Sequence, residues 1–314
     1  MSDPVERLFV ADPEPAVSTR RRRARSGASI GILAGILALV ALVGPFLVAD
    51  PNVQNLAAGY QPPFLLSGGS AQHLLGTDQL GRDILARMVF GLRSSVETGL
   101  LAVGLGAAFG TLVGLLAGYR GGWVDDVIMR VVDVQLAIPS IMLLLLVVSV
   151  LQPSFITVVF VLALLAWVVY VRVGRAEVLA LKEQDMVVGL VAMGASPARV
   201  VFRHILANIA GPLIVVTTIE FAHVVIAGAA LSYLGLGIPP PDPTLGGMIS
   251  DGQDGLTAGL WWPVVMPGAL LTILVLSVSG LGEGLRGRFD PRARVRASRP
   301  GARGRRAAGQ SKIG

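Results

Sequence analysis

The sequence has no cysteine among its 314 residues, which excludes disulfide bonds and thiolate metal sites. Its only two lysines, Lys182 and Lys312, do not follow a glycine. The chain therefore lacks the phosphate-binding Gly-x-x-x-x-Gly-Lys loop and cannot hydrolyse ATP by that route. Only three histidines occur, and we expect His73, His204 and His223 to lie in an outer loop, a cytoplasmic helix and a membrane span, where they cannot share a metal ion.

Charge is also scarce. Charged residues make up 15% of the chain, against roughly 25% in soluble domains. Several apolar runs are each long enough to cross about 30 Å of hydrocarbon. Four of them are free of charge and a fifth contains one acid, Glu220; they cover residues 28–49, 98–119, 134–171, 255–282 and, with the acid, 205–234. The 134–171 run is long enough for two crossings, divided at Gln152 and Pro153. We therefore predict an all-α membrane protein with six transmembrane helices.

These apolar runs have two alternative interpretations. Six buried helices of a soluble protein would leave little amphipathic surface to cover them. The first run, 28–49, follows basic residues as in a signal peptide, but it is longer than the usual 7 to 15 residues. We expect it to remain as an anchor.

The distribution of basic residues predicts the orientation. With both termini in the cytoplasm, only Arg82, Arg87 and Arg93 fall outside, which leaves 23 of the 26 Lys and Arg residues inside. Many of these lie in two tails, 1–27 and 286–314, which we expect to be flexible. Without interleaved aromatic residues they favour membrane lipid, or no partner, over nucleic acid.

The outer segment 50–94 is expected to contain an amphipathic helix. Thr77 or Asp78 can cap it, and Leu80, Ile84 and Met88 then share one face. The pattern is typical of an interfacial helix or of a lid packed on the bundle. The membrane core is expected to follow at 95–285.

The second span carries four glycines at four-residue spacing, Gly106, Gly110, Gly114 and Gly118. Small residues at this spacing let two helices approach backbone to backbone. We expect a packing role rather than a direct role in a transport pathway.

Glu220 lies deep in a predicted span, and His223 shares its helical face. A charge at this depth is costly, so the acid should face protein or water. Two interpretations stay open: a role along a translocation pathway, and a neutral, hydrogen-bonded helix contact.

Residues 182–212 predict a polar helical hairpin between two spans. Gly194 can close one short helix in a left-handed conformation, while Ser196 caps a second helix that starts at Pro197. The first helix has an apolar surface that needs a protein partner, formed by Met186, Val187, Leu190, Val191 and Met193. The alternative is an ordinary connecting loop packed on its own bundle.

The hairpin resembles the coupling loop of permease subunits in bacterial ATP-binding-cassette (ABC) importers. Further motifs resemble the C-type permease of the dipeptide, oligopeptide and nickel importer family, in family order: His73-Leu-Leu-Gly-Thr-Asp-Gln-Leu-Gly-Arg-Asp, Gly118-Tyr-Arg-Gly-Gly-Trp-Val-Asp, Arg203-His-Ile-Leu-Ala-Asn, Leu231-Ser-Tyr-Leu-Gly-Leu-Gly and Gly282-Glu-Gly-Leu-Arg, then Asp290-Pro291. Gly189, Leu190 and Val191 stand where the family usually has an Ala-Ala pair and a basic residue.

The resemblance implies the type I ABC importer permease fold in the bacterial cytoplasmic (inner) membrane. It implies a coupling loop at 182–209, whose ATPase-coupling residues are Asp185, Val187, Gly189, Leu190, Ala192, Gly194, Ala195, Ser196 and Arg203. It also implies a non-catalytic subunit with no cofactor of its own, because ATP and Mg belong to the partner ATPases.

The partners implied are a homologous B-type permease, two ATP-binding-cassette ATPase subunits or domains, and an extracytoplasmic substrate-binding protein. The implied cargo is a dipeptide or oligopeptide, with nickel or another small solute as the alternative within the family. An ion-driven secondary carrier is the alternative from another class, but it should show inverted repeats and has no use for a capped cytoplasmic hairpin.

Overall fold

The computed structural model describes residues 16–289, with side chains described from Ser29 to Arg286. Within this range every regular element is helical. The longer helices are α1 (Ala16–Val43), α2 (Ile84–Arg120), α3 (Gly122–Ala137), α4 (Ser140–Leu151), α5 (Phe155–Lys182), α8 (Leu206–Tyr233) and α11 (Trp262–Phe289). The short ones are η2 (Gly44–Phe46), η3 (Leu56–Ala58), α6 (Asp185–Ala192), α7 (Pro197–Arg199), η4 (Val200–Ile205), α9 (Leu245–Asp251) and α10 (Gln253–Leu256).

Five helices in the described part are long and apolar enough to cross a membrane, and a sixth span exists if α3 and α4 count as one. These two helices meet at an angle of 93°. The break falls at Pro139, because the residue before a proline avoids the helical region and Ile138 is extended, with φ −91° and ψ 126°. Helix α4 has 12 residues, about 18 Å, and cannot cross alone. The predicted third span is therefore broken.

The predicted turn at Gln152 and Pro153 is confirmed. Helix α4 ends at Leu151 and α5 begins at Phe155, where the Ser154 hydroxyl accepts a hydrogen bond from the Thr157 amide at 3.1 Å. The prediction for the first tail is wrong in part, because α1 is already helical from Ala16. Residues 1–15 and 290–314, where the rest of the two predicted tails falls, lie outside the described residues.

The prediction of a separate amphipathic helix before the second span is wrong. Helix α2 is continuous for 37 residues, about 55 Å, so the amphipathic stretch is its first third. Its cap is Asp83, whose carboxylate accepts a hydrogen bond from the Ala86 amide at 2.8 Å. Thr77 is bound to Ala58 and Gln61 instead, and Asp78 to Leu80 and Arg82, so neither can cap the helix.

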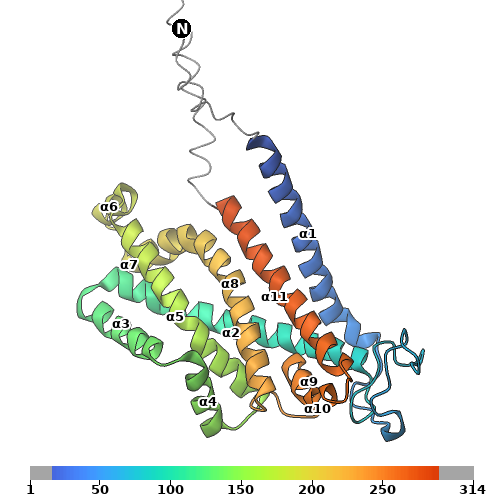
Figure 1. Cartoon of the computed structure of the whole chain (residues 1–314). Helices are drawn as coiled ribbons and strands as arrows, with labels where there is room; N and C mark the ends of the chain where they lie inside the picture. The colour runs from blue at the N-terminus through green and yellow to red at the C-terminus, as the bar shows by residue number, and fades with distance from the viewer. Residues whose placement is uncertain (1–15, 290–314) are drawn as a thin grey trace, which may run out of the picture.

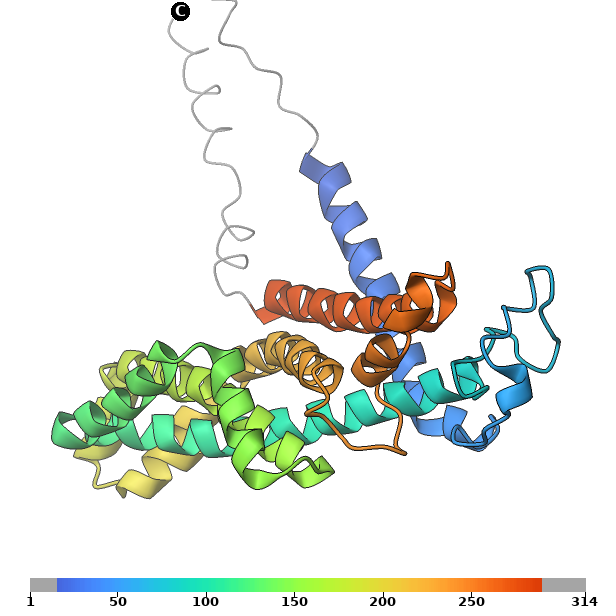
Figure 2. The ribbon, with the colours of Figure 1, turned by 60° about the horizontal axis from the view of Figure 1, so that its bottom comes forward.

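The spans place their connections at two opposite ends of the molecule (Figure 1). The start of α1, the end of α11 and the α6–α7 segment lie at one end. The segment 50–83, the α4–α5 turn and α9–α10 lie at the other. The turned view shows α2 running lengthwise from the 50–83 segment to α3 (Figure 2). The main hydrophobic core lies between α2, α5 and α8, with residues of α1, α4 and α11 completing it.

Helices α2 and α5 cross closely, and the four glycines of α2 lie on the contact face. A Cβ atom at Gly106 would come within 2.8 Å of the Ala166 Cβ, and one at Gly114 within 2.5 Å of the Val171 carbonyl oxygen. A Cβ at Gly118 would lie 2.8 Å from the Val178 Cβ. The absence of side chains at these positions is what permits the backbones to approach this closely.

We expect Gly110→Ala to lower the free energy of unfolding by about 1–3 kcal/mol, because the added methyl would overlap the Trp167 carbonyl and the Tyr170 Cβ. The matched control is Gly104→Ala, on the same helix, where an added Cβ meets nothing within 4 Å. Thermal unfolding of the purified protein in detergent measures both. Equal shifts for the two variants would contradict close packing at Gly110.

Candidate functional site

Helix α6 ends in the closure that the sequence predicts at Gly194. This residue has φ +81°, in the left-handed region. Its amide donates to the Val191 carbonyl at 2.9 Å, and the Ala195 amide donates to the Leu190 carbonyl at 3.0 Å. This pair of bonds is the Schellman pattern, which satisfies the last carbonyl groups of a helix and reverses the chain.

The second arm of the hairpin differs from the prediction of a separate short helix. Ser196 is extended and stands at the cap position, but its side chain makes no capping hydrogen bond. Pro197 takes the first turn as predicted, and the chain then passes through a π-helical stretch, η4, into α8. Helical backbone angles continue throughout, so Pro197–Tyr233 is one 37-residue helical unit. A short bent connection thus leads directly into a membrane span.

The hairpin is anchored by one apolar face. Val187 is 3% exposed and packs with Val200 and Ile205 against Leu115 of α2 and Val178 of α5. Leu190 and Ala195 are half-buried against the same cluster. The apolar surface expected to be free is therefore divided, because Val187 and Leu190 point into the protein's own bundle.

The rest of the hairpin surface is uncovered and carries further apolar side chains. Met193 is 78% exposed. Four further apolar side chains are each about half exposed, those of Met186, Val188, Val191 and Phe202. The same surface includes exposed polar residues, Asp185, Ser196, Arg199 and Arg203. Of the predicted coupling residues, Asp185, Ala192, Gly194, Ser196 and Arg203 lie on the exposed side, whereas Val187, Gly189, Leu190 and Ala195 are buried or half-buried.

An ion pair ties α3 to α5 near the hairpin. The Arg175 guanidinium donates through Nε and Nη2 to both carboxylate oxygens of Asp125, at 2.5 and 2.6 Å. Bidentate geometry of this kind fixes direction as well as distance. Lys182, at the end of α5, also donates to the Gly118 carbonyl at 3.4 Å. Helix α5, which leads into the hairpin, is therefore tied to α3 and to the end of α2.

Glu220 and His223 lie together on α8. Their side chains are 12% and 66% exposed, and Glu220 Oε1 lies 3.4 Å from His223 Nδ1. An exposed imidazole within a span is unfavourable next to lipid, so this face of α8 needs protein or water beside it.

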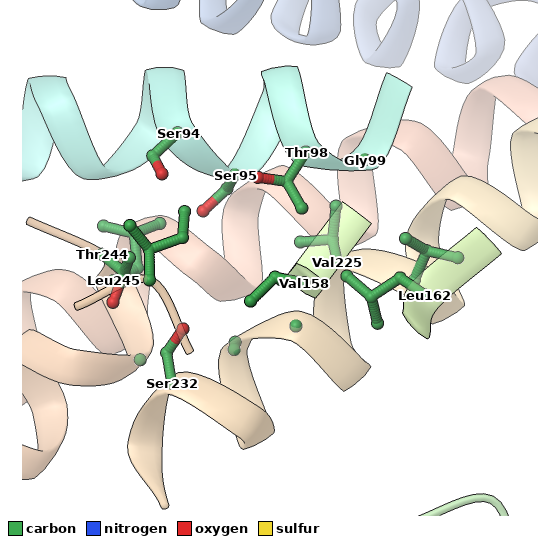
Figure 3. A pocket seen from close by; sticks show the side chains of 15 residues that line it. Ser94, Ser95, Thr98, Gly99, Val158, Leu162, Val225, Ser232, Thr244 and Leu245 are labelled. Atoms are coloured by element: carbon green, nitrogen blue, oxygen red, sulfur yellow. The ribbon is translucent and has the colours of Figure 1, made fainter. Parts of the chain in front are cut away.

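Two adjoining cavities lie toward the other end of the molecule. One is lined from α2 by Ser94, Ser95 and Thr98, which face Thr244 and Ser232 (Figure 3). The Thr98 hydroxyl oxygen is buried without a hydrogen-bond partner among the described residues. The second cavity, which we call the outer cavity, has Ser232, Ile238 and Thr244 in common with the first and a volume of about 210 Å³.

An ion cluster at the outer cavity was not predicted. It joins Asp78 and Arg82 of the outer segment with Arg87 of α2 and Asp251 of α9. Nearby, burial and then the charges of Asp254, Asp78 and Asp251 raise the pKa of the Tyr60 hydroxyl. The motif from His73 to Asp83 contains half of this cluster, but nothing in it points to the distant Asp251.

A bundle of apolar spans, one of them broken, fits a membrane permease. The exposed hairpin, which continues into a span, offers a contact for a partner protein. Residues 110–295 match the family described as "Binding-protein-dependent transport system inner membrane component". The chain belongs to this family, and it is a permease subunit of an ABC importer in the inner membrane.

Curated relatives cover nearly the whole chain. It is 40% identical to the dipeptide transport system permease protein DppC of Haemophilus influenzae over 85% of this chain and 90% of that protein. It is 37% identical to the di/tripeptide transport system permease protein DppC of Pseudomonas aeruginosa, over 89% and 93%. It is 34% identical to the oligopeptide transport system permease protein OppC of Bacillus subtilis, over 87% and 88%.

A solved structure shares the fold. It is a chain of the MetNI methionine ABC transporter in an inward-facing conformation, with a TM-score of 0.52 and 20% identity. The similarity covers 65% of this chain and 97% of that chain. The predicted ABC importer permease fold is therefore confirmed.

We expect Gly194→Ala to speed hydrogen exchange at the amides that close α6 by roughly 5- to 30-fold. A side chain in the left-handed region costs about 1–2 kcal/mol. Gly189→Ala, where the added Cβ meets nothing within 4 Å, should slow exchange in α6 because alanine favours helix. Similar changes in both variants would contradict a closing role for Gly194.

Proposed function

We propose that this chain is a non-catalytic permease subunit of an importer that carries dipeptides and oligopeptides into the cytoplasm. Relatives at 34–40% identity are dipeptide, di/tripeptide and oligopeptide transport permeases, which supports this cargo. The absence of a phosphate-binding loop from the sequence supports assigning ATP and Mg to two partner ATPase subunits or domains. A homologous B-type permease and an extracytoplasmic binding protein complete the transporter.

The observation that carries the proposal is the hairpin from α6 to η4, with its anchored face and its free apolar face. Methionine and valine side chains surrounded by charges, outside the bundle, are suited to a groove on another protein. The excess of basic residues supports assigning this end of the molecule, and both termini, to the cytoplasm, where the ATPases would act.

The connection to α8 supplies a mechanism of coupling. Because the segment from Pro197 to Tyr233 is helically continuous, displacement of the hairpin by an ATPase moves the span with it. The buried contacts of Val187, Leu190 and Ala195 pass the same displacement to α2 and α5. Rigid-body rocking of this kind converts ATP-driven closure of the ATPases into alternating access.

We expect Met193→Glu to weaken association with the partner ATPase by about tenfold or more, because it places a charge in the centre of the docking face. Leu65→Glu, the same kind of change at an exposed apolar position in the segment 50–83, is the control. Copurification of the ATPase with the tagged chain measures binding, and the amount of chain in the membrane confirms insertion. Undiminished copurification of the Met193→Glu variant would contradict the docking role.

We place Glu220 and His223 along the translocation pathway, because a buried acid beside an exposed imidazole marks a face of α8 that needs polar surroundings. Glu220→Gln should then lower peptide uptake by about tenfold through loss of a charged contact. Glu97→Gln, which changes an exposed acid on α2, should leave uptake unchanged. Wild-type uptake by the Glu220→Gln variant would assign the pair to helix packing.

A further inference from the structure

Arg87 is a buried cation with weak partners. Its side chain is 6% exposed, and its nearest acids are Asp78 at 3.6 Å and Asp251 at 3.9 Å, both beyond hydrogen-bond distance. Its Nη1 is enclosed and has no hydrogen-bond partner among the described residues. A buried guanidinium with unsatisfied donors is costly, because it has lost its water without gaining hydrogen bonds.

The neighbouring acids cannot satisfy it. Asp78 Oδ1 already accepts hydrogen bonds from the amides of Leu80 and Arg82, and its Oδ2 accepts one from Arg82 Nε at 2.6 Å. Asp251 is 46% exposed and is held by Arg82 at 3.4 Å. The hydrogen bonds of Asp78 to the loop and to Arg82 therefore fix its carboxylate. The more exposed Asp251 is the acid that can move away from Arg87.

Arg87 also lines the outer cavity. The wall combines two guanidinium groups, from Arg82 and Arg87, with two carboxylates, from Asp242 and Asp251. A free dipeptide carries one carboxylate and one ammonium group, and the cavity offers both complementary charges. The cavity has a volume of about 210 Å³, which suits a ligand smaller than the drug-sized molecules that occupy larger sites. Through Ser232, Ile238 and Thr244 the cavity adjoins the hydroxyl-lined one beneath it.

We propose that Arg87, assisted by Arg82, binds the terminal carboxylate of the incoming cargo at the outer end of the permease. This inference rests on the proposed import of peptides and adds the group by which the permease itself recognises them. Asp251 moves off Arg87 as the cargo carboxylate approaches, and its own carboxylate then faces the ammonium end. Arginine is suited to this task because its planar donors pair with both carboxylate oxygens.

The test is uptake of dialanine and of its C-terminal amide by the complete transporter in proteoliposomes, with the binding protein saturated by each peptide in turn. Wild type should take up dialanine about tenfold or more faster than the amide. Arg87→Gln should reduce dialanine uptake to the level of the amide. Arg87→Lys, which keeps the charge but loses the planar fork, should retain part of the preference and covers the case in which the glutamine variant fails to assemble.

Arg93→Gln is the matched control, since Arg93 lies on the same helix but is 42% exposed and paired with Glu97. It should leave the ratio of the two uptake rates unchanged. The proposal is overturned if Arg87→Gln lowers uptake of both peptides equally. It is also overturned if Arg87→Gln weakens docking of the binding protein but leaves the ratio of dialanine uptake to amide uptake unchanged. That result would assign recognition of the carboxylate to the binding protein. Failure of wild type to take up either peptide would instead remove the proposed cargo, and this inference with it.

Discussion

The contact between α2 and α5 determines where the rest of the molecule lies. Four glycines spaced one turn apart let the two helices meet backbone to backbone, and both helices run from one end of the molecule to the other. In hydrocarbon the gain comes from close packing rather than from exclusion of water, so a close fit over several turns is what holds the crossing. The hairpin packs on the C-terminal parts of these two helices, and the outer cavity opens beside the first turns of α2.

The number of apolar segments could be predicted from the sequence, because charge-free runs report directly on the cost of placing ions in lipid. The lengths of the helices could not be predicted in the same way. Helix α2 continues through Arg87, Arg93 and Glu97 because Arg93 pairs with Glu97 one turn away and Arg87 is buried in a cluster. These charges interrupt the hydropathy pattern without interrupting the helix. The reverse holds at Pro139, where a continuous apolar run contains a broken helix.

The hairpin was predictable in its backbone and less so in its surface. Gly194 and Pro197 impose local conformations that any surroundings must accept, and both behave as expected. The division of the apolar residues into an inner and an outer face depends on the ends of α2 and α5, which local sequence does not reveal. The ion cluster at the outer cavity was even less predictable from local sequence, because Arg82 and Asp251 are 169 positions apart. Only the folded arrangement brings them together.

The unbroken passage from Pro197 through η4 into α8 has a consequence for how this segment can vary. Each residue of an α-helix turns the chain by about 100°. Inserting or deleting a single residue between the hairpin and the first turn of α8 would swing the methionine and valine side chains to another side of the axis, while leaving every one of them present. Length is therefore under a stricter constraint here than composition, and substitutions should be tolerated where insertions are not.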